Sequence, residues 1–318
     1  MKKTAAISLI TIVTLIAGCQ SFKKPGCERA PTVRIGYLNL VTSLPLSVAG
    51  HEGFFTEQGV IYKAIPVASS NKIVEGIVAG DIDCFIGASA IPALAAELRA
   101  PGKLKVFAVS EITADQPFDA LLVRKDAPIR TLSDLSGKKV AVFPGTTAAN
   151  LLRKYLGDKG VNVSTITFVP MAPANHLDAL LKGSVDVIYA YEPTIAIALS
   201  KGAVKKLYGS VYADMLSPNP ISVSVVSTSF LRCHPETAAK VICALERAMK
   251  YMREQDKETQ SILAEQMKLS RDAANRCVFL YMLGHEQIDL AVFQRFADML
   301  TELGELKGHV VVDSLVYR

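Results

Sequence analysis

Short apolar runs of strand type alternate with amphipathic runs of helix type along this chain, and this alternation restricts its fold more than any other feature. Single helices between successive strands form βαβ units, which build a mainly parallel sheet with helices on both faces. The interpretation is an α/β fold. Strands are predicted at residues 33–38, 60–66, 82–86, 104–109, 139–143, 165–169, 185–190 and 221–227.

One pattern occurs twice, at residues 77–86 and 180–189. Each copy has a helix end, a glycine (Gly80 or Gly183), a two-residue turn, an aspartate (Asp83 or Asp186) and a buried strand. Glycine supplies the left-handed backbone at a helix end, and aspartate bonds to nearby turn backbone. Either any helix-to-strand turn looks like this, or the chain has two lobes of similar topology.

The last third of the chain is almost wholly helical. Apolar stripes with helical spacing predict helices at residues 235–252, 257–267, 270–283 and 290–303. With 318 residues, half of them hydrophobic, the chain is long enough for two domains with sizeable cores.

The N-terminus predicts export. Lys2 and Lys3 precede a short apolar run, as in a secretory signal peptide over residues 1–18. The last residues of that run, followed by Cys19, resemble a bacterial lipobox, which implies lipid attachment at Cys19, a tether over residues 19–30 and a membrane-anchored protein of the cell envelope. The alternative is a plain signal peptide with a chance cysteine.

Charge and cysteine content limit the function classes. The formal charge of +5 falls to +3 once Lys2 and Lys3 are removed, and no basic run argues for nucleic acid as a partner. The histidines lack metal-ligand spacing, so we expect no metal and no cofactor. In an oxidising compartment a disulfide is allowed. The sequence leaves the pairing open; a bridge among three cysteines of predicted helices is one arrangement: Cys233, Cys243 and Cys277.

Four motifs in order resemble the sulfonate, taurine and nitrate-binding branch of periplasmic solute-binding proteins, which also includes binders of thiamine pyrimidine precursors. They lie at residues 33–60, 80–87, 135–147 and 183–193. The resemblance implies a two-lobed type II periplasmic-binding-protein fold with the ligand in the cleft. Lobe one would be residues 31–125 plus 223–318 and lobe two residues 126–222, joined by crossing strands at 120–125 and 223–228.

The same resemblance implies a monomeric component of an ABC importer, whose partners are a small molecule, a permease and an ATPase. Its ligand would be sulfonate-like, taurine-like or similar to a thiamine precursor. A surface lipoprotein or sensor that kept the fold without transport is the second reading. An enzyme of this fold is the third, but no Gly-x-Ser-x-Gly, HExxH or Walker motif is present. We therefore predict a binding protein and no catalytic residue.

The candidate ligand residues follow strands and precede helices. Ligands of open α/β sheets sit beyond the carboxyl ends of the strands, where free N–H groups of helix starts favour an anionic oxygen. Ser89, Thr146 and Thr147 can also serve only as helix caps. Glu192 would accept bonds from a ligand N–H, or form an ion pair across the lobes, or lie on a solvated rim. The predicted set is Asn39, Ser43, Ser89, Gly145, Thr146, Thr147, Tyr191 and Glu192.

Overall fold

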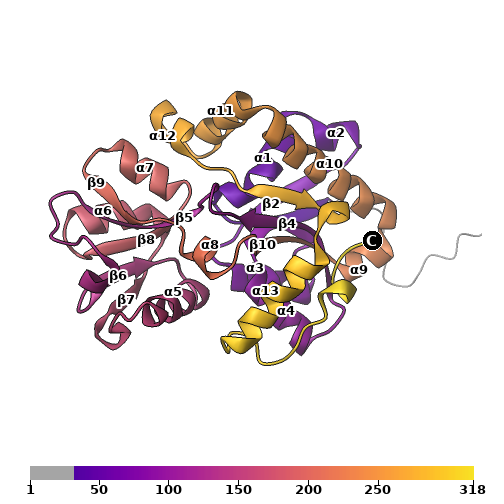
Figure 1. Cartoon of the computed structure of the whole chain (residues 1–318). Coiled ribbons are helices and arrows are strands. Elements are labelled where there is room, and N and C mark those ends of the chain that lie inside the picture. Colours follow the sequence, from indigo (N-terminus) through magenta and orange to yellow (C-terminus); the bar gives the residue numbers. More distant parts are fainter. Residues whose placement is uncertain (1–31) are drawn as a thin grey trace, which may run out of the picture.

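The computed structural model describes residues 32–318, which form two sheets, each flanked by helices (Figure 1). The predicted signal peptide, the lipid site at Cys19 and the tether lie outside the described residues. The first sheet has the order β2-β1-β3-β10-β4-β11 and the second β7-β6-β8-β5-β9. Within the described part of the chain, no helix has both the length and the apolar character of a membrane span.

The strand bounds are as follows. The first sheet contains β1 (Val33–Tyr37), β2 (Tyr62–Pro66), β3 (Cys84–Ser89), β4 (Leu104–Ile112), β10 (Asn219–Ser227) and β11 (Tyr281–Gly284). The second contains β5 (Asp119–Arg124), β6 (Lys139–Val142), β7 (Thr167–Pro170), β8 (Val187–Tyr191) and β9 (Val204–Tyr208).

The helices cover the sheets and fill the C-terminal third. Around the first sheet are α1 (Leu44–His51), α2 (Phe54–Glu57), α3 (Ser70–Ala79), α4 (Ala90–Arg99), α9 (Thr228–Cys233), α10 (Pro235–Glu254), α11 (Asp256–Gln266), α12 (Arg271–Arg276) and α13 (Leu290–Glu302). Around the second are α5 (Thr147–Asp158), α6 (Pro173–Leu181) and α7 (Thr194–Ser200), and α8 (Val211–Met215) lies where the chain returns to the first sheet.

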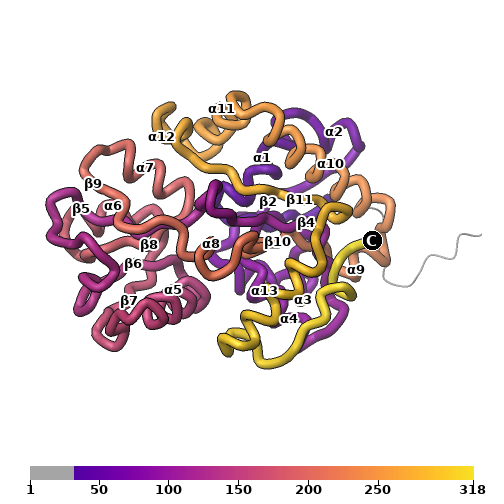
Figure 2. The backbone as a smooth tube through the Cα atoms, in the orientation of Figure 1, coloured from indigo at the N-terminus to yellow at the C-terminus, as the bar shows by residue number. Residues whose placement is uncertain are grey.

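Both sheets are mixed, and most strands in each run in one direction, in agreement with the prediction of mainly parallel sheets. β1 pairs in parallel with β2 and β3, and β6 with β7 and β8, as βαβ units require. The strands that run the other way are β10, between β3 and β4, and β11, at the edge beside β4, in the first sheet, and β5, between β8 and β9, in the second. The chain crosses from one sheet to the other before β5 and returns before β10, as the tube in Figure 2 shows.

The two sheets share one topology, because β2-β1-β3-β10-β4 corresponds strand by strand to β7-β6-β8-β5-β9. The repeated pattern occupies equivalent places. Asp83 accepts the backbone N–H of Arg34 on the next strand at 2.8 Å, and Asp186 accepts that of Lys139 at 2.9 Å. The aspartates therefore fasten neighbouring strands, and do not bond their own turns. Gly80 and Gly183 have φ of +84° and +73°, as expected.

The first crossing segment lies earlier in the chain than we predicted. We placed residues 120–125 in lobe one, but β5 belongs to the second sheet, so the chain crosses at about residues 113–118 and returns at about 209–218. The lobe limits at residues 125 and 222 stay a prediction.

The predicted helix at residues 270–283 is wrong in its second half. The helix α12 ends at Arg276, and β11 pairs antiparallel with β4. Unpaired backbone groups at the edge of β4 accept this strand, and its aromatic and apolar residues suit a half-buried sheet position.

A bridge among the three C-terminal cysteines, one of the arrangements that the sequence left open, is not present. Cys243 and Cys277 are free thiols, whereas Cys233 is disulfide-bonded. Cys84 is a fully buried free thiol.

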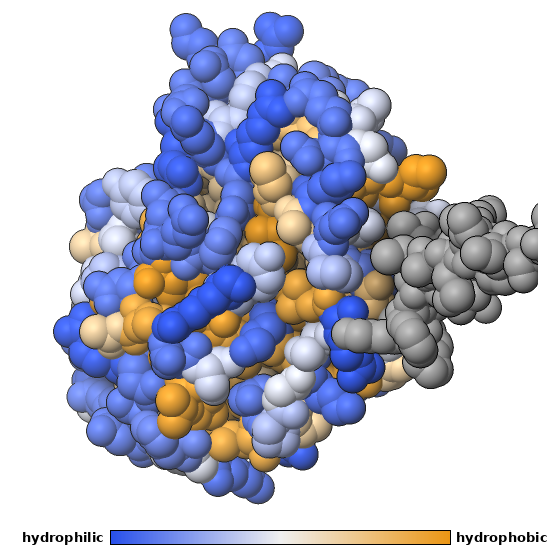
Figure 3. Space-filling model, turned by 90° about the vertical axis from the view of Figure 1, so that its right-hand side faces the viewer, coloured by the Kyte–Doolittle hydropathy of each residue, from blue (hydrophilic) through white to orange (hydrophobic). Residues whose placement is uncertain are grey.

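The apolar core is continuous between the sheets. One cluster of buried residues includes Val33 of β1 and Val140 of β6, and a smaller cluster covers the other face of the second sheet. The face shown in Figure 3 is largely hydrophilic, with small apolar patches between the polar residues.

Candidate functional site

A partly open cavity lies between the two sheets, at the carboxyl ends of two parallel strands from each sheet. Leu38 follows β1, Ser89 ends β3, Phe143 follows β6 and Tyr191 ends β8. These strands are equivalent pairs in the two halves, so the cavity sits where an α/β sheet presents its helix N-termini. The other lining residues are Leu40, Thr42, Ser70, Asn71, Gly87, Phe118, Pro144, Gly145, Thr147, Ala148, Tyr212, Ile221 and Ser222.

The loop after β1 is fastened to β3. Thr42 Oγ1 donates to the Gly87 carbonyl at 2.7 Å, and Ser43 Oγ donates to the Ile86 carbonyl at 2.9 Å while accepting the Leu38 N–H. Gly87 has a φ of +66°, and a Cβ there would lie 2.0 Å from the backbone carbonyl oxygen of Thr42. Glycine is therefore required for the close approach that shapes this wall.

Two hydroxyls in the cavity have no hydrogen-bond partner among the described residues. They are Ser89 Oγ, at the N-cap of α4, and Ser222 Oγ, on β10. The two residues are register partners in the β3–β10 pair, and Ser222 is only 4% exposed. The Ser89 N–H is already used, because it donates to Ser70 Oγ at 3.0 Å. A buried hydroxyl without a partner costs free energy unless a ligand bonds to it.

Three helices of ten residues or more begin at the cavity. Ser70 and Asn71 open α3, Ser89 caps α4, and Thr147 opens α5. Gly145, just before α5, has a φ of +105°, and a Cβ there would lie 4.0 Å from Asn71 Oδ1. Helix N-termini carry about half a positive charge and free N–H groups.

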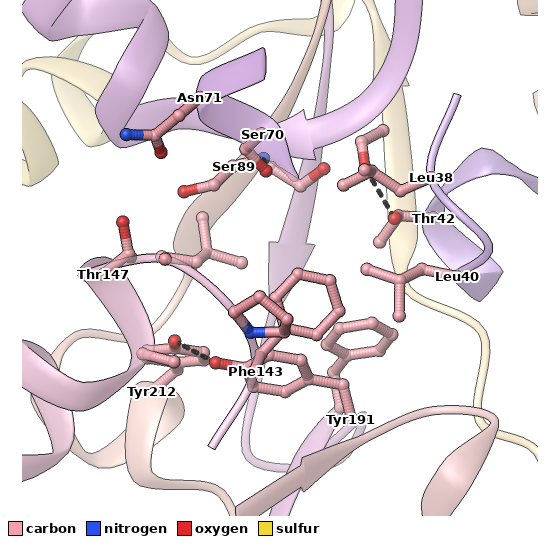
Figure 4. Close-up of a pocket in the computed structure, with 17 residues that line it drawn as sticks. Leu38, Leu40, Thr42, Ser70, Asn71, Ser89, Phe143, Thr147, Tyr191 and Tyr212 are labelled. Carbon is pink, nitrogen blue, oxygen red and sulfur yellow. Dashed lines mark hydrogen bonds between the residues drawn. The ribbon is translucent and has the colours of Figure 1, made fainter. Parts of the chain in front are cut away.

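Aromatic rings form the opposite side of the cavity. Figure 4 shows Phe143, Tyr191 and Tyr212 on one side, and Ser70, Asn71, Ser89 and Thr147 toward the other. The hydroxyls of Tyr191 and Tyr212 bond to each other at 2.7 Å. Burial raises the pKa of both phenols, so both stay protonated.

No lining residue of this cavity is charged; there is no Asp, Glu, Lys, Arg or His among them. An anion bound here would be held by neutral donors and helix dipoles. The described residues also contain no group of three or more metal-ligating side chains.

The structure brings together four of the eight predicted residues: Ser89, Gly145, Thr147 and Tyr191 all line the cavity. The other four do not. Asn39 is exposed, Ser43 is bonded to backbone, and Thr146 lines a neighbouring groove. Ligand contact by any of the eight stays a prediction.

Glu192, the fourth residue outside the cavity, is 2% exposed, so the solvated rim is not its environment. Its Oε2 accepts the Ala196 N–H at 3.1 Å at the start of α7, and its carboxyl meets Cys277 and Val278, which follow α12. Burial raises the pKa of Glu192 to about 7, an effect reduced by the Ala196 N–H and by the charge of Lys206.

Sequence reasoning missed several lining residues. Phe118 and Tyr212 lie on the crossing segments. Ser222 lies on β10, which is distant in the sequence from its neighbour β3. Ser70 and Asn71 carried a usable signal, because they begin a helix after a strand, as Thr147 does.

The comparisons with known proteins agree with this geometry. The family model described as NMT1/THI5 like matches residues 41–259, well over half of the chain. The chain belongs to this family. A curated relative, the "putative aliphatic sulfonates-binding protein" of Bacillus subtilis, is 24% identical over 260 residues, covering 79% of this chain and 75% of the relative.

Solved structures show the same fold. The alkanesulfonate-binding protein SsuA of Xanthomonas axonopodis pv. citri, bound to MOPS, has a TM-score of 0.72 at 22% identity, covering 92% of this chain and all of that one. The periplasmic nitrate-binding protein NrtA of Synechocystis PCC 6803 has a TM-score of 0.65 at 17% identity, covering 89% and 83%.

The predicted α/β periplasmic-binding-protein fold and the predicted family branch are thus confirmed. The relatives named here are binding proteins, in agreement with the prediction that this chain is not an enzyme.

Proposed function

We propose that this protein is the solute-binding component of an ABC-type importer and captures a small organic oxyanion of the sulfonate class. The observation that carries the proposal is the cavity between the two sheets, where three helix N-termini meet two buried hydroxyls without partners, Ser89 and Ser222. The relatives named for sulfonate and nitrate binding support this ligand class.

The chemistry fits a singly charged anion with three oxygens. Sulfonate oxygens accept several hydrogen bonds and stay ionised at all ordinary pH values. Donors at helix starts satisfy them without a cationic side chain. An unpaired positive charge in the cavity would instead oppose release of the ligand to a permease.

Calorimetric titration of the purified protein with butanesulfonate, butanoate and nitrate tests the proposal. We expect saturable one-site binding of the sulfonate and weaker binding of the other two. Absence of binding to every anion would contradict the proposal.

Ser222→Ala separates a ligand role from a structural role. Because its hydroxyl has no hydrogen-bond partner among residues 32–318, we expect alanine to raise the free energy of unfolding by about 1 kcal/mol and to weaken sulfonate binding about tenfold. Ser224→Ala is the matched control on the same strand: its hydroxyl accepts the Gly87 N–H at 3.2 Å, so its loss should lower stability. An unchanged affinity in Ser222→Ala would argue against this hydroxyl as a ligand donor.

We also propose that the protein is exported and lipid-anchored through Cys19, on the basis of the lipobox-like sequence before it. Labelled palmitate should enter the wild-type protein and the Cys243→Ser control, but not Cys19→Ser. Equal label in all three would overturn the assignment of Cys19.

A further inference from the structure

The aromatic side of the cavity is an ordered array of rings centred on Tyr191. Phe118 stacks on Tyr191 with ring centroids 5.7 Å apart and planes 9° apart, and Tyr212 stacks on it at 5.9 Å and 23°. Phe143 lies 5.9 Å from the same ring at 42°. All four rings line the cavity.

Contacts behind the array hold the rings in place. Tyr189 meets Tyr191 edge-on, and its hydroxyl donates to Asp119 at 2.8 Å. The hydroxyls of Tyr191 and Tyr212 form a hydrogen bond with each other, and the Phe118 side chain is buried, at 4% exposed. A ligand on this side therefore meets ring carbon, together with apolar side chains such as Leu40 and Ile221.

The array is suited to a flat group and not to a cation. Rings that enclose an ammonium group turn their faces toward one centre, whereas Phe118, Tyr191 and Tyr212 are close to parallel. Offset parallel rings are extended by another ring. No carboxylate lines the cavity. Two buried carboxylates close to Tyr191 already accept hydrogen bonds: Glu192 from Ala196, and Asp119 from Ser210, Tyr189 and Val211.

Ser70, Asn71 and Ser89, at the starts of α3 and α4, lie across the cavity from Phe143, Tyr191 and Tyr212, and Thr147, at the start of α5, lies between the two groups (Figure 4). We infer that the ligand is an aromatic sulfonate whose oxyanion faces Ser89 and Ser222 and whose ring continues the array at Tyr191 and Phe143. Aminoalkane sulfonates such as taurine are disfavoured, because their ammonium group would have no partner. This inference rests on the proposed function and narrows its substrate class.

The test compares ligands that differ only in the ring. Calorimetric titration of the wild-type protein with benzenesulfonate and cyclohexanesulfonate should give about tenfold tighter binding of the aromatic compound, the size expected of one or two aromatic contacts. Taurine should bind most weakly of the sulfonates. Because this comparison needs no variant, it does not depend on how a substitution folds.

Phe143→Leu should remove most of the preference for benzenesulfonate and leave cyclohexanesulfonate binding nearly unchanged. Phe168→Leu is the matched control, since Phe168 is half-buried, contacts Arg153 and does not line the cavity; it should keep the preference. Equal affinity for the two rings, or tightest binding of taurine, would overturn the inference while leaving sulfonate capture intact. Failure of all sulfonates to bind would overturn the proposed function itself.

Discussion

Glu192 is a buried carboxyl at a contact between elements of the two halves of the molecule. Burial raises its pKa to about 7, against an unfolded value near 4.5. A folded-state pKa above the unfolded one means that the folded protein binds the proton more tightly. The stability from this group is therefore complete below about pH 4.5 and is lost as the pH rises through 7.

We predict that the free energy of unfolding falls by up to about 3 kcal/mol from this group between pH 4.5 and pH 8. Glu192→Gln keeps an acceptor for the Ala196 N–H but cannot ionise, so its stability should fall less over the same range. Urea denaturation at several pH values measures this. Burial also raises the pKa of Asp119 to about 6, so ionisation of Asp119 lowers the free energy of unfolding over the same pH range. Part of the decrease will therefore remain in Glu192→Gln.

The exposed Glu302 on α13 provides the control, because Glu302→Gln should follow the wild-type pH profile. A Glu192→Gln profile identical to the wild type would show that the carboxyl does not titrate in this way. The same variant tests the predicted ligand role: if its sulfonate affinity is unchanged, Glu192 does not bind the ligand.

At the scale of elements, Asp119 joins the two crossing segments. It begins β5, and its carboxylate accepts from Ser210 Oγ at 2.5 Å and from the Val211 N–H at 2.7 Å, both at the start of α8. Asp119→Ala would leave these donors and the Tyr189 hydroxyl buried without a partner. We predict a loss of about 3 kcal/mol in the free energy of unfolding, measured by denaturant titration.

The matched control is Asp115→Ala. Asp115 is exposed on the same crossing segment and should change stability by less than about 0.5 kcal/mol. Equal effects of the two substitutions would show that the Asp119 bonds do not hold the crossing.

The elements that the sequence predicted well are those fixed by local physics. The turns at Gly80 and Gly183 need a left-handed residue, and the strands after them are short apolar runs, so their type and place follow from neighbouring residues. The strand-to-helix loops at Ser89 and Thr147 were found for the same reason.

The errors involve pairing between distant segments. Nothing local shows that β10 enters between β3 and β4, or that residues 281–284 take the free edge of β4. Of the aromatic side of the cavity only Tyr191 was predicted, since Phe118 and Tyr212 reach the cavity only once the crossing segments are placed. Ser222 becomes a neighbour of Ser89 through the same pairing.

At the scale of the whole molecule, the halves touch on more than one side of the cavity. α12 packs against α7, where Glu192 meets Cys277, and Asn150 of α5 donates to Glu305 after α13 at 3.5 Å. The main apolar cluster is also continuous from β1 to β6. The main core is therefore shared by the two sheets, and only the smaller cluster belongs to the second sheet alone.

We predict that the protein unfolds in one cooperative transition, with equal calorimetric and van't Hoff enthalpies, because loss of either half exposes part of the shared cluster. Benzenesulfonate at about 100 times its Kd should stabilise the folded protein by about 2.7 kcal/mol, since it contacts both halves, and should raise the midpoint by several degrees without splitting the transition. Differential scanning calorimetry with and without the compound measures both quantities. Two separate transitions, with only one moved by the ligand, would show that the halves fold independently and that the compound is held by one of them alone.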